Sequence, residues 1–138
     1  MEPKGHELTV AAEIYRLHDV LAFVDELLEA HYCPMKAQTQ IGIALEELFV
    51  NIAHYAYPEG TGEAMIRVVF TSESAQITLI DSGIPYDPLK KPDPDVTLSA
   101  QDRPIGGLGI FMTKKLMDDV SYEYKDGKNH LTIKKLFK

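Results

Sequence analysis

The sequence contains only one cysteine, Cys33. This excludes an internal disulfide framework and a zinc site built from several cysteines. Long hydrophobic runs are also missing. No segment approaches the roughly 18 to 20 apolar residues that span a bilayer, and residues 1–8 lack the apolar core of a signal peptide. We therefore expect a cytoplasmic protein that does not enter the membrane.

Basic residues are in the minority. The chain has 14 lysines and arginines against 21 aspartates and glutamates, which gives a formal net charge of −7. This excess of negative charge argues against broad, sequence-independent binding to nucleic acid or to an anionic membrane. The 138 residues, 45% hydrophobic and 25% charged, have the length and composition of one globular domain over residues 1–138.

The spacing of apolar residues changes several times along the chain. Helical spacing after Leu17, and again through Ile41, Leu45 and Leu48, predicts two amphipathic helices. Branched apolar residues with polar ones interleaved predict strands. In chain order we expect a strand at 7–14, a helix from 17 that ends at 31–34, a helix at 35–56, strands at 64–71 and 76–81, a loop at 82–104, a short helix that includes 111–117, and strands at 120–124 and 130–137 joined by a turn at 126–129.

This order of elements predicts an α/β (α+β) two-layer sandwich. The strands come in adjacent pairs, so we expect a mixed, mostly antiparallel sheet that is covered on one face by helices. The alternating strand and helix of a doubly wound fold is not the pattern of this sequence.

The second predicted helix has a polar face as well as an apolar one. Glu47 and Asn51 are four residues apart and therefore lie one above the other on the helix surface. A carboxylate and a carboxamide suit a hydrated Mg²⁺ ion, which takes few protein ligands. Glu46 lies about 100° away from that line and is the poorer candidate. The alternative is an ordinary solvated helix face.

A second candidate segment follows a predicted strand. It reads Asp81-Ser-Gly-Ile-Pro-Tyr-Asp-Pro88. A carboxylate at Asp81 can accept a hydrogen bond from an exocyclic amine such as that of adenine, and Gly83 would let the backbone approach a flat ring. The alternative is an ordinary turn, for which Asp-Ser-Gly is also suited.

The third candidate segment is rich in glycine. It reads Gly106-Gly-Leu-Gly-Ile-Phe-Met112 and opens the third predicted helix. Free N–H groups and the positive end of a helix dipole attract phosphate. The segment is neither a Walker-type loop nor a Rossmann fingerprint. The alternative is a structural helix start.

Taken together, the three segments are far more specific than any one alone. The order Glu47-Leu-Phe-Val-Asn51, then Asp81-x-Gly-x-Pro, then a long loop and Gly-Gly-x-Gly resembles the ATP-binding fold shared by gyrase, Hsp90, histidine kinases and MutL. Within it, the chain is most similar to the bacterial anti-sigma-factor serine kinases. The similarity covers nearly the whole chain and implies the histidine-kinase-like ATPase fold.

The resemblance implies roles for individual residues. Asn51 matches the asparagine that holds Mg²⁺, and Glu47 matches the acid proposed as general base toward the substrate serine. Asp81 matches the aspartate that binds the adenine amino group, with Gly83 beside it. Glu46 stands where a small residue is common, so the choice of base between the two adjacent acids is less clean.

The resemblance also implies a phosphate end of the site. Gly107 and Gly109 match the glycines there, and residues 84–106 match the ATP lid. Three further residues fall near nucleotide-contacting positions with a looser alignment: Arg103, Thr113 and Lys114.

From the resemblance we expect an ATP- and Mg²⁺-dependent protein serine/threonine kinase. Its expected partners are a small anti-sigma-factor antagonist that it phosphorylates, a sigma factor that it sequesters, and a second copy of itself. One alternative is a nucleotide-binding anti-sigma module without kinase activity. The other is a structural domain that binds no nucleotide.

Overall fold

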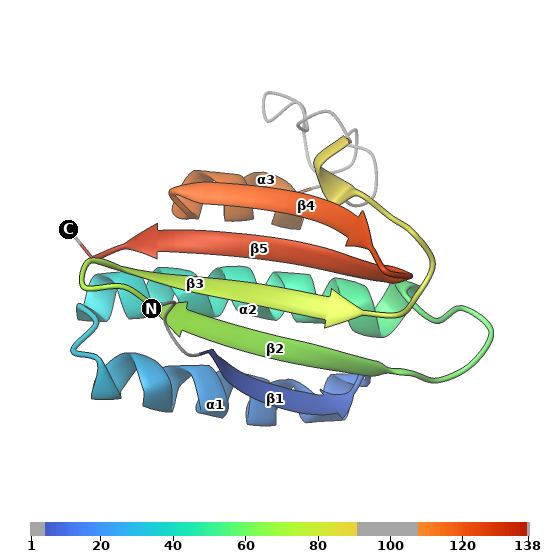
Figure 1. Ribbon diagram of the computed structural model, residues 1–138, viewed down its shortest axis with the longest axis horizontal. Helices are drawn as coiled ribbons and strands as arrows, with labels where there is room; N and C mark the ends of the chain where they lie inside the picture. Colours follow the sequence, from blue (N-terminus) through green and yellow to red (C-terminus); the bar gives the residue numbers. More distant parts are fainter. Residues whose placement is uncertain (1–4, 91–107, 138) are drawn as a thin grey trace.

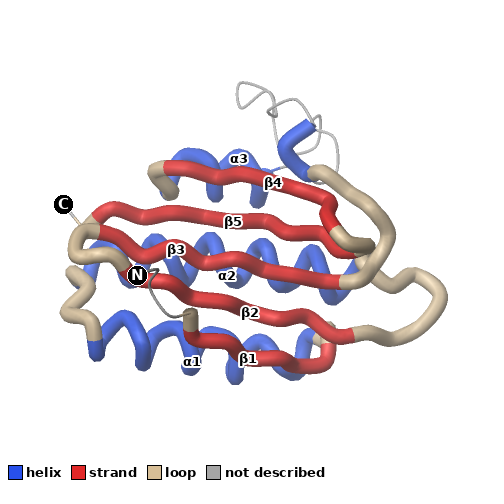
Figure 2. The backbone as a smooth tube through the Cα atoms, in the orientation of Figure 1, coloured by secondary structure: helices blue, strands red, loops and turns tan. Residues whose placement is uncertain are grey.

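The computed structural model describes residues 5–90 and 108–137. Within these ranges it contains a five-stranded sheet and three α-helices, which form two layers (Figures 1 and 2). The elements are β1 (His6–Ala11), a 3₁₀ turn (Ile14–Arg16), α1 (Leu17–Ala30), α2 (Met35–Tyr55), β2 (Glu63–Phe70), β3 (Ser74–Asp81), a 3₁₀ turn (Pro88–Lys90), α3 (Leu108–Leu116), β4 (Asp119–Lys125) and β5 (Lys128–Leu136).

The described strands lie in the order β1-β2-β3-β5-β4, and every neighbouring pair is antiparallel. The predicted two-layer sandwich is therefore confirmed, with an antiparallel rather than a mixed sheet in the described part of the chain. The last strand, β5, inserts between β3 and β4. This register sets Asp81, the last residue of β3, directly opposite Asn129 near the start of β5.

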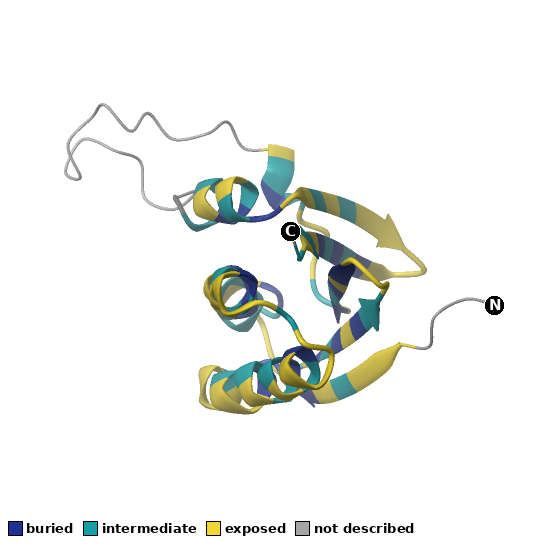
Figure 3. Cartoon of the chain, turned by 90° about the vertical axis from the view of Figure 1, so that its left-hand side faces the viewer, coloured by how far each residue is buried: buried dark blue, intermediate teal, exposed yellow. Residues whose placement is uncertain are grey.

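The core lies between the helices and one face of the sheet, as the side view shows (Figure 3). Ile41, Leu45 and Leu48 of α2 are at most 2% exposed, which confirms the predicted apolar face of this helix. The sheet contributes alternate residues because successive side chains of a strand point to opposite faces. Its largest fully buried members are Ile66, Val68, Ile77, Leu79 and Ile133.

The turn between the last two strands is shorter than the sequence pattern predicts. Asp126 and Gly127 both have positive φ, 56° and 75°, and they alone connect β4 to β5. Two residues with positive φ make the type I′ hairpin turn, for which Asp-Gly is a preferred sequence. The expected turn at 126–129 is therefore wrong at its last two positions, since Lys128 and Asn129 belong to β5.

The expected ATP lid at 84–106 is described only in its first part. Pro88–Lys90 form a short 3₁₀ turn. Residues 91–107 lie outside the described residues, and they include two predicted site residues, Arg103 and Gly107. Within the described ranges, none of the helices combines the length and the apolar character that crossing a bilayer requires.

Candidate nucleotide site

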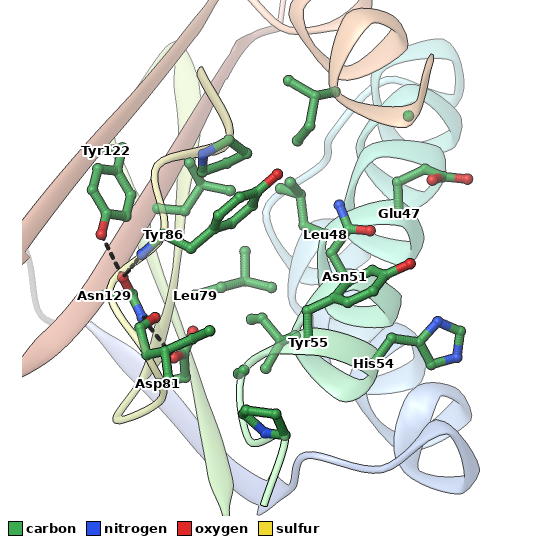
Figure 4. Close-up of a pocket in the computed structure, with 18 residues that line it drawn as sticks. Glu47, Leu48, Asn51, His54, Tyr55, Leu79, Asp81, Tyr86, Tyr122 and Asn129 are labelled. Atoms are coloured by element: carbon green, nitrogen blue, oxygen red, sulfur yellow. Dashed lines mark hydrogen bonds between the residues drawn. The ribbon is translucent and has the colours of Figure 1, made fainter. Parts of the chain in front are cut away.

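A cavity of about 590 Å³ lies between the C-terminal half of α2 and one end of the sheet. Its volume is within the range of small-molecule and cofactor pockets. Figure 4 shows Glu47 and Asn51 on α2 along one side, and Asp81, Asn129 and Tyr122 on the strands along the other. Apolar side chains such as Leu48 and Leu79 form its floor. The structure therefore brings all three predicted segments to one cavity, the third through Gly109 and Ile110 of α3.

Asp81 is the buried carboxylate of this cavity, with 6% of its surface exposed. Its Oδ1 atom accepts two hydrogen bonds of 2.9 Å, from the backbone N–H of Gly83 and from Nδ2 of Asn129. Among the described residues, Oδ2 accepts none. One carboxylate oxygen is thus anchored by the protein, while the other is left to accept a hydrogen bond from a bound molecule.

The backbone after Asp81 is held to the end of α2. The N–H of Ser82 donates to the Tyr57 hydroxyl at 2.9 Å, and the N–H of Ile84 donates to the carbonyl of Ala56 at 3.0 Å. The Tyr57 hydroxyl in turn donates to the carbonyl of Glu63 at 2.6 Å. Burial raises the pKa of Tyr57, so this hydroxyl remains protonated and keeps both contacts at neutral pH.

Gly83 is required here by packing. A Cβ at this position would lie 2.3 Å from the carbonyl oxygen of Ala56 and 2.6 Å from its side chain. The residue does not line the cavity. Glycine therefore lets the turn after Asp81 pack closely against the end of α2, and the approach of the Gly83 backbone to a flat ring stays a prediction.

Glu47 is distinguished from Glu46 by its surroundings. Glu47 is half-buried and lines the cavity with Asn51, four residues later, whereas Glu46 is exposed and lies outside the lining. A Cβ on Gly109 would lie 2.2 Å from Oε2 of Glu47. The carboxylate therefore rests against the first turn of α3, and glycine leaves the space for it. Neither the Glu47 nor the Asn51 side chain has a hydrogen-bond partner among the described residues.

Comparison of the sequence with models of known protein families shows which family this chain resembles. The family model described as the histidine kinase-like ATPase domain matches residues 10–135. The chain belongs to this family. The resemblance drawn from the three sequence segments is thereby confirmed.

Named relatives of this ATPase domain are protein kinases. The serine/threonine-protein kinase BtrW of Bordetella bronchiseptica is 24% identical over 134 residues, which is 96% of this chain and 94% of that protein. The serine-protein kinase RsbW of Bacillus cereus is 30% identical over 96 residues, which is 67% of this chain and 60% of that protein.

A solved structure shares the fold of this ATPase domain. It comprises the RsbU and RsbW domains of a Mycobacterium tuberculosis protein, and it matches with a TM-score of 0.67 at 16% identity. The match covers 96% of this chain and 32% of that chain.

Two residues of α3 that were predicted to contact the nucleotide, Thr113 and Lys114, do not line the cavity. Thr113 is 1% exposed, and its hydroxyl donates to the carbonyl of Gly109 at 2.9 Å. It therefore belongs to the packing of the helix. Lys114 is half-buried, and it too is outside the cavity lining. Contact of Thr113 and Lys114 with the nucleotide stays a prediction, and their position outside the cavity lining gives it no support.

Asn129 is the site residue that sequence reasoning missed. The sequence pattern predicts a turn at this position, whereas Asn129 lies in β5, is 6% exposed and is hydrogen-bonded to Asp81. A signal was present, since Asp-Gly alone forms a two-residue hairpin turn and places the next residues in a strand. The contact itself joins residues 48 positions apart and depends on the pairing of β3 with β5.

Proposed function

We propose that this protein is an ATP-dependent serine/threonine protein kinase that acts as an anti-sigma factor. The observation that carries the proposal is the placement of Glu47, Asn51 and Asp81 around one cavity. The family match and the kinase names of the relatives support it. The alternative, a nucleotide-binding anti-sigma module without kinase activity, would bind ATP in the same cavity but would not need Glu47.

Adenine is the group that Asp81 would bind. Its Oδ2 is available to accept a hydrogen bond from the exocyclic amine, and the apolar floor of the cavity suits the face of a purine ring. The phosphates would then extend toward the start of α3. There Gly109, and by the resemblance Gly107, would expose backbone N–H groups at the positive end of the helix.

The residues present fit a magnesium ion that is bound together with nucleotide. In the described ranges no group of three His, Cys, Asp or Glu side chains could hold a metal by itself. The Asn51 side chain lines the cavity and has no hydrogen-bond partner within residues 5–90 and 108–137. Mg²⁺ usually keeps several waters and binds through few protein ligands plus substrate phosphates, so the amide oxygen of Asn51 can serve as its protein ligand. When bound, the ion would neutralise charge on the phosphate oxygens.

Glu47 would orient or deprotonate the serine hydroxyl that attacks the terminal phosphate. Phosphoryl transfer depends mainly on positioning and on charge stabilisation, and a base held in a fixed place would add general-base catalysis to these. Residues 84–106 would close over the nucleotide as a lid and exclude water. Arg103 within it would contact a phosphate, a role that stays a prediction.

The proposed partners are proteins. The phosphoacceptor would be a small anti-sigma-factor antagonist, and a sigma factor would be bound and withheld from transcription. We also propose that the protein works in the cytoplasm and associates with a second copy of itself. The alternative without kinase activity would share these partners except that the antagonist would not be phosphorylated.

The test measures binding and transfer separately. We expect isothermal titration calorimetry with MgATP to show saturable binding, and radiolabelled ATP to label a purified antagonist protein on serine or threonine. Binding without transfer to any antagonist would favour the binding module. No ATP binding would contradict both readings.

Gly109→Ala is expected to impair transfer without harming the fold. The new methyl would lie only 2.2 Å from Oε2 of Glu47, which is closer than van der Waals contact allows, so the carboxylate must move. Misplacement of a reacting group by about 1 Å can cost on the order of 10²-fold in rate. Alanine is the better helix former, so urea unfolding should show no loss of stability. Full transfer by the variant would show that Glu47 does not need this position.

A further inference from the structure

Asn129 is a buried amide whose hydrogen-bonding capacity is completely used. Its Nδ2 group donates to Oδ1 of Asp81 and to the carbonyl of Ile84, both at 2.9 Å. Its Oδ1 atom accepts from the N–H of Tyr86 at 3.1 Å and from the hydroxyl of Tyr122. A primary amide has two N–H donors and one oxygen with two acceptor positions, so these four contacts satisfy it fully.

The orientation of this amide follows from the chemistry of its partners. The Nδ2 side faces a carboxylate and a carbonyl, which can only accept. The Oδ1 side faces a backbone N–H and a tyrosine hydroxyl. Burial raises the pKa of Tyr122, and the nearby charges of Asp87 and Asp81 raise it further, so this hydroxyl stays a donor. The opposite orientation would set donors against donors and acceptors against acceptors in a buried place, which is costly.

The fixed amide of Asn129 in turn holds the carboxylate of Asp81 in one orientation. The amide of Asn129 and the N–H of Gly83 both point at Oδ1, so the carboxylate cannot rotate without losing two hydrogen bonds. Oδ2 is therefore the oxygen that remains for a ligand, and as part of a carboxylate anchored by two donors it can act only as an acceptor. A purine with an amino group opposite Oδ2 is accepted, whereas one with a carbonyl oxygen there is repelled.

We propose that Asn129 is a positioning residue that makes the cavity selective for a 6-aminopurine by holding the Asp81 carboxylate in this orientation. The proposal rests on the proposed function, in which the cavity binds ATP. Asn129 acts through Asp81 and does not itself need to touch the nucleotide.

The test compares ATP with purine riboside triphosphate, which lacks only the 6-amino group. Both are titrated with Mg²⁺ by calorimetry into the wild-type chain and into Asn129→Leu, a substitution of similar volume. A hydrogen bond to a charged group predicts that the wild type prefers ATP by roughly 10- to 100-fold. We expect this preference to fall to about threefold or less in the variant, because the Asp81 carboxylate then keeps only one of its two anchoring hydrogen bonds, that from the N–H of Gly83.

Loss of packing alone gives a different result, because it would weaken both ligands equally and leave their ratio unchanged. An unchanged ratio would overturn the proposal. If the wild type binds ATP and the analogue equally, the proposal also fails, although the proposed function stands. If the wild type binds neither, the proposed function itself is wrong, and the inference falls with it.

Two further variants keep the test sharp. Tyr124→Phe makes a conservative change on β4 at an exposed residue outside the cavity lining, so we expect it to keep the wild-type preference for ATP. Should the leucine variant fail to fold by circular dichroism, Asn129→Ser is measured instead. The smaller side chain leaves room for water to bond the backbone of Ile84 and Tyr86, and the same loss of preference is expected.

Discussion

Replacement of Glu47 by glutamine is expected to lower phosphoryl transfer by roughly 10²- to 10⁴-fold, the usual contribution of a general base. Glutamine has nearly the shape of glutamate, so it should fit the space that Gly109 leaves beside it. It cannot take a proton from the attacking hydroxyl. Binding of ATP should change little because the adenine end of the cavity, at Asp81, is untouched. Transfer of radiolabelled phosphate at saturating ATP, with calorimetry of ATP binding, measures both quantities.

The adjacent acid provides a matched control for this prediction. Glu46 is exposed and lies outside the cavity, so Glu46→Gln makes the same chemical change one residue away and should transfer phosphate at the wild-type rate. Equal losses in the two variants would mean that overall helix charge, and not a base at Glu47, supports transfer. Full activity of Glu47→Gln would contradict the assigned role.

Gly83→Ala is expected to have the largest effect on stability. Its Cβ would lie 2.3 Å from the carbonyl oxygen of Ala56, a rigid backbone atom that also accepts the N–H of Ile84. Overpacking of this kind costs roughly 1–3 kcal/mol, and the turn after Asp81 would be pushed away from α2. We therefore expect a lower free energy of unfolding in urea together with weaker binding of ATP.

Gly42 offers the control for this substitution. A Cβ on Gly42, within α2, would meet no atom within 4 Å. Gly42→Ala should therefore stabilise the protein by up to roughly 1 kcal/mol, as alanine does in helix interiors. If Gly83→Ala were as stable as the wild type and bound ATP as tightly, the contact between the turn and α2 would not be needed to hold Asp81.

The polar face of α2 illustrates what local sequence can predict. Residues four apart lie on one face of any α-helix, so Glu47 and Asn51 could be grouped before their surroundings were known. The apolar residues of the same helix point to the core for the same geometric reason, and Ile41, Leu45 and Leu48 are buried as expected. The relation of Glu47 to Gly109 was not predictable in this way, because it depends on how α3 packs against α2.

Asn129 illustrates where local reasoning ends. The Asp-Gly turn before it indicates a strand position but no contact with Asp81, since its partners lie on β3, on β4 and in the segment after β3. The packing reason for glycine at position 83 could not be predicted either, because the atom that a side chain there would meet belongs to Ala56, 27 positions earlier. In both cases the deciding contact joins distant parts of the chain.

By itself, the sequence determined the kinds of elements, the two faces of α2 and the family to which the three spaced segments point. These depend on periodicity and on turn chemistry, which act between residues a few positions apart. Only the tertiary structure decided which acid faces the cavity, what anchors the carboxylate of Asp81, and why Gly83 and Gly109 must be glycine. These follow from the insertion of β5 beside β3 and from the packing of α3 and the Asp81 turn against α2, which bring atoms into contact across long stretches of sequence.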